Sequence, residues 1–127
     1  MNKSKVSDLV FVCSGAADVG ELTDRAARAL QRQGLAAMSC LASVGARDET
    51  ILFNATFARR VLLIDGCSKA CARRTFERAG LDWFAQFDLS AVGLRKGRSA
   101  VTPENIDRVV AHAARILGVQ SPRPRPE

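Results

Sequence analysis

Short apolar runs alternate along the chain with longer segments in which apolar residues recur at helical spacing. This alternation predicts strands joined by helices, and therefore an α/β fold built on a parallel sheet. The run Val61 to Ile64 contains no polar residue, as expected for a central strand covered on both faces. Gln86 and Asp88 interrupt the last run and favour an edge position. The predicted strands lie near Asp8 to Val12, Ala36 to Cys40, Arg60 to Ile64 and Trp83 to Leu89.

Four longer segments are predicted to be helical. The clearest start signal is Thr102-Pro103-Glu104, because Thr caps a helix, Pro suits its first position and Glu favours its positive end. We expect a loop through Gly45 between the second strand and the second helix. The predicted helices run from about Glu21 to Gln33, Asp48 to Ala58, Ser68 to Ala79 and Thr102 to Gly118.

This order of elements predicts a single three-layer αβα domain with a mostly parallel four-stranded sheet. Right-handed crossovers and a reversal between strands one and three give the strand order 2-1-3-4. We expect residues 1–118 to form the domain, since 127 residues suit one hydrophobic core. The Pro- and Arg-rich residues 119–127 are expected to be a flexible tail, because closely spaced prolines prevent both helix and strand pairing.

Composition places the protein in a reducing compartment. The segment Met1 to Asp8 is polar, and no run approaches the roughly 18 apolar residues of a spanning helix. We therefore expect a cytoplasmic protein, in which structural disulfides are rare. Four cysteines in such a protein indicate metal or thiol chemistry instead.

The net charge of +6 suggests an acidic partner only weakly. The basic residues are dispersed, no aromatic residues interleave with them, and there is no Tyr. The glycine-rich turn Gly15 to Gly20 is followed by Glu21 and Leu22, where a P-loop needs Lys and a hydroxyl. We expect a metal ion as partner, no specific nucleic acid and no membrane, and leave a protein partner open.

The four cysteines are the candidate site. Cys13, Cys40 and Cys67 follow the first three predicted strands, and Cys71 lies four residues after Cys67. Because the carboxyl ends of parallel strands meet at one edge of a sheet, these thiols are expected to converge there. Four thiolates are a typical tetrahedral ligand set for Zn²⁺. A helix start near Cys67 and Cys71 would also favour their thiolate forms.

Several neighbouring residues are candidates for supporting the metal. Asp65 could orient a loop amide, and Ser14 adjoins Cys13. Four thiolates around one Zn²⁺ carry a net charge of about −2. Lys69, Arg95 and Lys96 would offset that charge, although an ordinary basic surface loop is the slightly favoured explanation.

The run Ile64-Asp65-Gly66-Cys67-Ser68-Lys69-Ala70-Cys71-Ala72 resembles the central motif of the DGC domain family of small bacterial proteins. Cys13-Ser14-Gly15 and Cys40-Leu41-Ala42 are similar to the family's other cysteine blocks, and Gly93-Leu94-Arg95-Lys96 extends the resemblance to about Lys96. It implies zinc binding by Cys13, Cys40, Cys67 and Cys71, with no established reaction. Ser68 departs from the family, whose members often have Pro there.

The sequence therefore predicts a small cytoplasmic protein with a structural or sensory Zn(Cys)₄ site. One alternative is a thiol-redox protein that uses Cys67, Cys71 and Cys13, although C-x₃-C differs from the usual redox spacing. Another is an enzyme with zinc as Lewis acid, which needs one cysteine to dissociate. His112 is the only histidine, so no catalytic triad can be assembled without it, and no catalytic residue is predicted.

Overall fold

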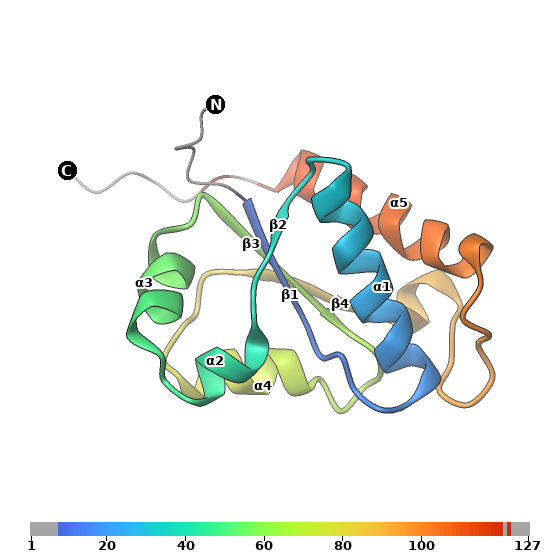
Figure 1. The fold of residues 1–127 in the computed structure, drawn as a ribbon, viewed down its shortest axis with the longest axis horizontal. Helices are drawn as coiled ribbons and strands as arrows, with labels where there is room; N and C mark the ends of the chain where they lie inside the picture. Colours follow the sequence, from blue (N-terminus) through green and yellow to red (C-terminus); the bar gives the residue numbers. More distant parts are fainter. Residues whose placement is uncertain (1–7, 121, 123–127) are drawn as a thin grey trace.

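A four-stranded parallel sheet forms the centre of the molecule (Figure 1). The structure, a computed structural model, describes residues 8–120 and 122. All three strand pairs are parallel and the order is β2-β1-β3-β4, which confirms the predicted α/β fold and strand order. The strands are β1 (Asp8–Val12), β2 (Ala37–Met38), β3 (Arg60–Asp65) and β4 (Ala85–Asp88).

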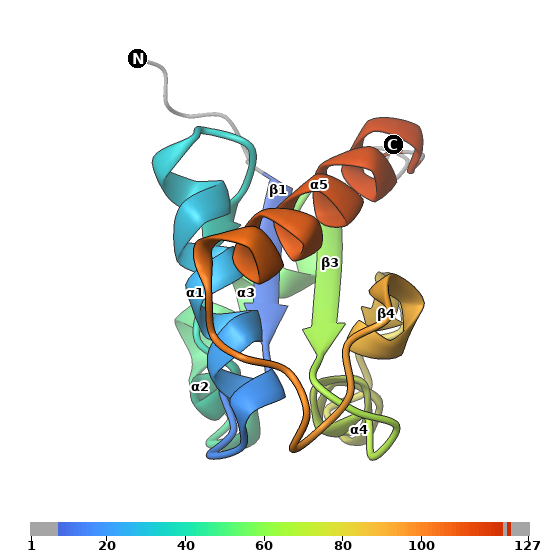
Figure 2. The ribbon, with the colours of Figure 1, turned by 90° about the vertical axis from the view of Figure 1, so that its right-hand side faces the viewer.

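Helices cover both faces of the sheet and complete the predicted three layers (Figures 1 and 2). On one face, α1 (Asp18–Arg32) and α5 (Pro103–Val119) pack on Val10, Val12, Leu62 and Ile64. On the other face, Phe11, Val61 and Leu63 pack on α2 (Leu41–Gly45), α3 (Glu49–Phe57) and α4 (Cys71–Arg78). Alternate strand residues thus enter two separate cores, which explains why β3 is apolar almost throughout.

Three predicted elements differ in length from those observed. The second strand was expected over Ala36 to Cys40 but pairs only through Ala37 and Met38, because the chain turns at Cys40 into α2. That short helix replaces part of the expected loop through Gly45. The fourth strand ends at Asp88, whose side chain accepts a hydrogen bond from Ser90 N at 2.9 Å and starts the 3₁₀ turn η1 (Leu89–Val92).

Two helices begin at positions other than those predicted. The first begins at Asp18 and not near Glu21, because Gly20 allows the helix to approach Gly15 closely. An added Cβ at Gly20 would lie 2.3 Å from Gly15 O. The third predicted helix begins at Cys71 and not at Ser68, because Ala70 adopts a left-handed conformation with φ 52°.

The last helix begins at Pro103, directly after the predicted cap residue Thr102. The Thr102 hydroxyl acts as the cap, because it accepts a hydrogen bond from Asn105 N at 3.2 Å. It ends at Val119, one residue beyond the predicted stop at Gly118. Of the predicted tail, residues 121 and 123–127 lie outside the described residues. Among the described residues, no helix is both long and apolar enough to cross a membrane.

Candidate cysteine site

The four cysteines lie at the carboxyl edge of the sheet, as the strand order predicts. Cys13 directly follows β1 and its N–H donates to Ile64 O at 3.3 Å, which continues the β1–β3 ladder by one bond. Cys40 and Cys67 each follow their strands, β2 and β3, by two residues. Cys71 is the first residue of α4. Three strands and one helix therefore bring the cysteine backbones to the same edge.

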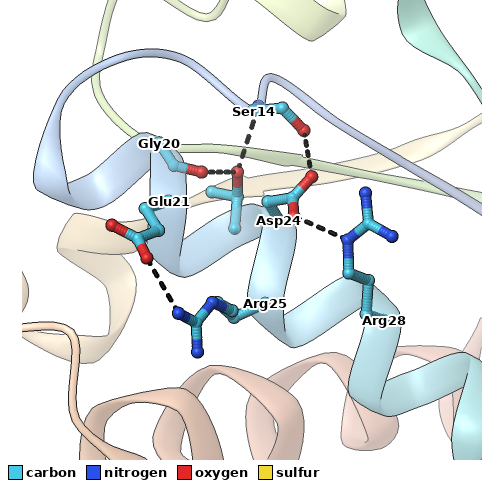
Figure 3. A network of polar contacts seen from close by, with 7 residues as sticks. Ser14, Gly20, Glu21, Asp24, Arg25 and Arg28 are labelled. Atoms are coloured by element: carbon cyan, nitrogen blue, oxygen red, sulfur yellow. Dashed lines mark hydrogen bonds and ion pairs between the residues drawn. The ribbon is translucent and has the colours of Figure 1, made fainter.

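Cys13 has the most defined surroundings of the four. Its partly buried Sγ accepts a hydrogen bond from Gly66 N at 3.3 Å and lies 3.6 Å from Thr23 Oγ1. The Thr23 hydroxyl donates to Gly20 O at 2.8 Å and accepts from Ser14 N at 3.3 Å, and Figure 3 draws both contacts. Because its hydrogen is already used, its oxygen is also left to accept from the Cys13 thiol. The sulfur is thus held between the end of β3 and the first turns of α1.

Asp65 fixes the start of α4 and therefore the position of Cys71. Its carboxylate is fully buried and accepts hydrogen bonds from Ala72 N at 2.6 Å and Arg73 N at 3.3 Å. These are two of the amide groups that have no partner within the helix. Gln86 Nε2 donates a third hydrogen bond at 3.0 Å. The sequence led us to expect that Asp65 orients a loop amide; in the structure its amide partners belong to the first turn of α4.

Gly66 allows the end of β3 to pack directly against the start of α1. A Cβ at this position would lie 3.0 Å from Val19 Cγ2 and 3.1 Å from the Val19 carbonyl carbon. These contacts are tighter than nine in ten real Cβ contacts, so a side chain here would require its neighbours to shift by a few tenths of an ångström. In the Asp65-Gly66-Cys67 sequence, the first residue therefore caps a helix, the second permits close packing and also donates to Cys13, and the third presents a thiol.

Two strained residues adjoin the cysteines. Ser14 and Ala70 have φ values of 50° and 52°, in the left-handed region that side chains other than Gly, Asn and Asp rarely adopt. Ser14 follows Cys13 and Ala70 precedes Cys71. Only one other non-glycine residue among those described, Arg47, has a positive φ. Backbone strain of this kind concentrates at functional sites.

Cys40 is exposed at the N-cap of α2. Ser43, through its side chain and then its backbone, lowers the pKa of the Cys40 thiol below its ordinary value of 9.0, against an opposing effect of desolvation. Its thiolate is therefore more accessible near neutral pH than that of an unperturbed cysteine.

Cys13 and Cys40 face a common pocket of about 830 Å³. The polar side of this pocket is already paired: Asp24 accepts from Arg28 Nε at 2.7 Å and from Ser14 Oγ at 2.9 Å (Figure 3). The Arg28 hydrogen bond is the main reason that the pKa of Asp24 is lowered. The pocket is lined by Val12, Cys13, Ser14, Asp24, Arg28, Gln31, Met38, Ser39, Cys40, Leu41, Ala42, Gly45, Ile51 and Thr75.

The predicted cationic neighbours occupy two separate loops. Lys69 is exposed between Cys67 and Cys71, where its carbonyl accepts from Arg74 Nη1 at 3.4 Å. Arg95 and Lys96 are exposed on a loop that is hydrogen-bonded to Asp18 at the start of α1.

The Asp18 carboxylate makes two hydrogen bonds to that basic loop. It accepts from Gly97 N at 2.9 Å and Ser99 N at 3.0 Å, and these contacts, in that order, lower the pKa of Asp18. The sequence prediction did not identify this contact. The available signal was an acidic residue within the glycine-rich turn, but its hydrogen-bond partners are about eighty positions away, and no local pattern indicates them.

The shared edge does not by itself assemble a metal-ligand sphere. Cys13 and Cys67 are partly buried, whereas Cys40 and Cys71 are exposed. Within residues 8–120 and 122, no group of three or more His, Cys, Asp or Glu side chains is arranged to hold a metal ion. The predicted ligands therefore share an edge, and Cys13 and Cys40 share a pocket, without the four sulfurs forming one cluster.

Comparisons with known proteins agree with the motif and the fold. The DGC domain matches residues 9–113 of the chain. A protein of Pseudomonas aeruginosa named anaerobic and virulence modulator AnvM is 35% identical over 88 residues, which cover 69% of this chain and 67% of that protein. No solved structure matches. The match over most of the domain, together with the Asp65-Gly66-Cys67 geometry, shows that the chain belongs to the DGC domain family.

Proposed function

We propose that the carboxyl edge of the sheet binds one zinc ion through Cys13, Cys40, Cys67 and Cys71, in a structural or sensory role. The single observation that carries the proposal is the delivery of four thiols to one edge by β1, β2, β3 and α4. Thiolates are the ligands that zinc prefers in closed structural sites.

The donor set fits zinc in kind but not in its present arrangement. Metal binding would require the exposed side chains of Cys40 and Cys71 to turn toward the partly buried sulfurs of Cys13 and Cys67. Ser14, next to Cys13, and Ala70, next to Cys71, have strained backbone conformations. Strain of this kind is typical of functional sites, which supports a ligand-binding role for this edge of the sheet. When bound, zinc would supply a charge that holds deprotonated sulfurs together.

The hydrogen bond from Gly66 N to Cys13 Sγ supports the same proposal. An amide donor to sulfur fixes the position of a metal ligand. Gly66 can make this contact because its missing side chain allows close approach to α1. Gly66 of the Asp-Gly-Cys motif therefore positions the sulfur of Cys13, a proposed ligand that follows a different strand from Cys67.

A sensory role is supported by the name of the relative from Pseudomonas aeruginosa, which describes a modulator. A site whose ligands are partly exposed can respond to metal supply or to oxidants, whereas a purely structural site is usually buried. We propose the cytoplasm as its location, because thiols remain reduced there.

The alternative function is thiol-redox chemistry, and one observation favours it. Cys13 and Cys40 line one pocket, and the pKa of Cys40 is lowered by Ser43. This pair differs from the Cys67 and Cys71 pair expected from sequence. Oxidation of two thiols to a disulfide by a peroxide would release two electrons and two protons, with the peroxide reduced to water.

Zinc content measured together with free thiols in anaerobically purified protein separates these functions. The zinc proposal expects about one zinc per chain, released in step with thiol loss when peroxide is added. Protein that binds no zinc under reducing conditions contradicts it. Quantitative disulfide formation in metal-free, folded protein would establish the redox alternative.

A further inference from the structure

The outer side of α3 carries an unpartnered apolar stripe. Phe53 is 63% exposed and Phe57 is 50% exposed, and their ring centroids lie 4.7 Å apart. Glu49, which is also exposed, lies one turn before Phe53, so the three residues follow the helix at i, i+4 and i+8 on one side. Two large rings that contact each other but remain largely in water form a patch suited to a partner.

Opposite charges stand at the two ends of this stripe. Glu49 lies in the first turn of α3, and Arg59 is exposed two residues after the helix ends at Phe57. A surface with an acid at one end and a base at the other is complementary to a copy of itself turned end to end.

An antiparallel pair of α3 helices satisfies both the rings and the charges. With the two-fold axis midway between Phe53 and Phe57, each Phe53 meets Phe57 of the partner subunit. Arg59, which follows the extended C-cap Ala58, then lies near the first turn of the partner helix, which carries Glu49 of the partner subunit.

We propose that the protein forms a symmetric dimer through α3, with Phe53 and Phe57 at its centre and Glu49 and Arg59 at its rim. The interface is small, so the dimer should be weak, with a dissociation constant on the order of 10 µM. Of the stripe residues, none lines the pocket that contains Cys13 and Cys40. Dimer formation is therefore independent of the proposed zinc site and can be tested apart from it.

Sedimentation of the full chain over a range of concentrations tests the central aromatic contact. Replacing both rings, Phe53→Ser with Phe57→Ser, should raise the dissociation constant about 100-fold, because each ring loses its burial in the dimer. Leu35→Ser, at another exposed apolar position, is the matched control and should leave the dimer unchanged. Thermal unfolding by circular dichroism shows whether each variant is folded. A wild-type chain that is monomeric at every concentration overturns the proposal.

Charge exchange tests the identity and direction of the partner. Glu49→Arg and Arg59→Glu should each weaken the dimer about threefold to tenfold, and the two changes combined should restore it, because each pair occurs twice across the two-fold axis. A dimer that is unaffected by the ring replacements, or not restored by the combined charge exchange, contradicts this geometry. Binding of a monomeric chain to anionic vesicles or an acidic peptide through the same rings would also overturn it.

Discussion

At the scale of single residues, Asp65 and Gly66 place the thiols through contacts that involve no metal. The buried carboxylate of Asp65 accepts from two amides of α4, and Gly66 fits against Val19 and donates to Cys13 Sγ. The two residues thus connect β3 with both neighbouring helices. This explains why they stand directly before Cys67, since any movement there would displace the ends that carry the other thiols.

Gly66→Ala should destabilise the fold by about 1–3 kcal/mol, because the new methyl group would crowd the backbone of Val19 and Gly20 and force the start of α1 to shift by a few tenths of an ångström. Urea unfolding measures this change. Gly15→Ala is the matched control, since a Cβ at that position meets nothing within 4 Å and the cost should stay below about 0.5 kcal/mol. Equal effects of the two substitutions would show that close packing is not the reason for glycine at position 66.

At the scale of helices and strands, Asp18 joins the start of α1 to the loop that carries Arg95 and Lys96. Its hydrogen bonds to Gly97 N and Ser99 N connect segments that are far apart in sequence. The contact brings the basic loop beside the glycine turn that follows Cys13. The position of these cations therefore depends on a carboxylate that is ionised at neutral pH.

Asp18→Ala should lower stability at pH 7 and have a smaller effect in acid. The folded-state pKa of Asp18 lies below its ordinary value of 3.8, so its contribution is present above pH 3.8 and is lost as the pH falls through the folded-state value. Chemical unfolding of wild type and variant at pH 7 and about pH 3 measures the difference. Asp107→Ala, at an exposed acid of α5, is the control. A stability gap that widens as the pH falls would contradict this role.

Most elements could be predicted from sequence because their apolar periodicity and end signals are local. The apolar run of β3 and the Thr102-Pro103 start of α5 are examples. The start of α4 could not be predicted, because it depends on Ala70 in a left-handed conformation and on Asp65 from a preceding strand. The α2 helix is too short for periodicity to distinguish it from a loop.

The candidate site was predictable to the level of the sheet edge and no further. Parallel strand order is sufficient to bring Cys13, Cys40 and Cys67 to one edge. Strand order does not determine the direction of the cysteine side chains, because that direction depends on the strain at Ser14 and Ala70 and on the hydrogen bonds of Thr23. Neither serine nor alanine signals a positive φ in a sequence, so these features were missed.

At the scale of the whole molecule, the net charge of +6 is the property most open to misreading. A positive surface attracts nucleic acid through counterion release alone, without any specific site. Some of the basic residues are engaged in local ion pairs, such as the Arg28–Asp24 and Arg60–Asp8 contacts. The proposal that the protein has no specific nucleic-acid partner rests on this dispersal and on the lack of interleaved aromatic residues.

Binding to DNA or RNA should therefore be weak at low salt and disappear at about 0.2 M salt, because only released counterions drive it. Fluorescence anisotropy with labelled oligonucleotides of different sequence measures this dependence. Sequence-selective binding that persists at that salt concentration, with an affinity on the order of submicromolar, would contradict the proposal.

Zinc stoichiometry across the wild type and four single variants tests the central claim most directly. A shared ion would connect three βα units, so each of Cys13→Ser, Cys40→Ser, Cys67→Ser and Cys71→Ser should reduce bound zinc and lower the zinc-dependent melting temperature. We predict about one zinc per wild-type chain under reducing conditions, and weaker binding in all four variants. A wild-type chain that holds no metal when zinc is supplied, or loss of zinc in only the Cys67 and Cys71 variants, would contradict a four-cysteine site.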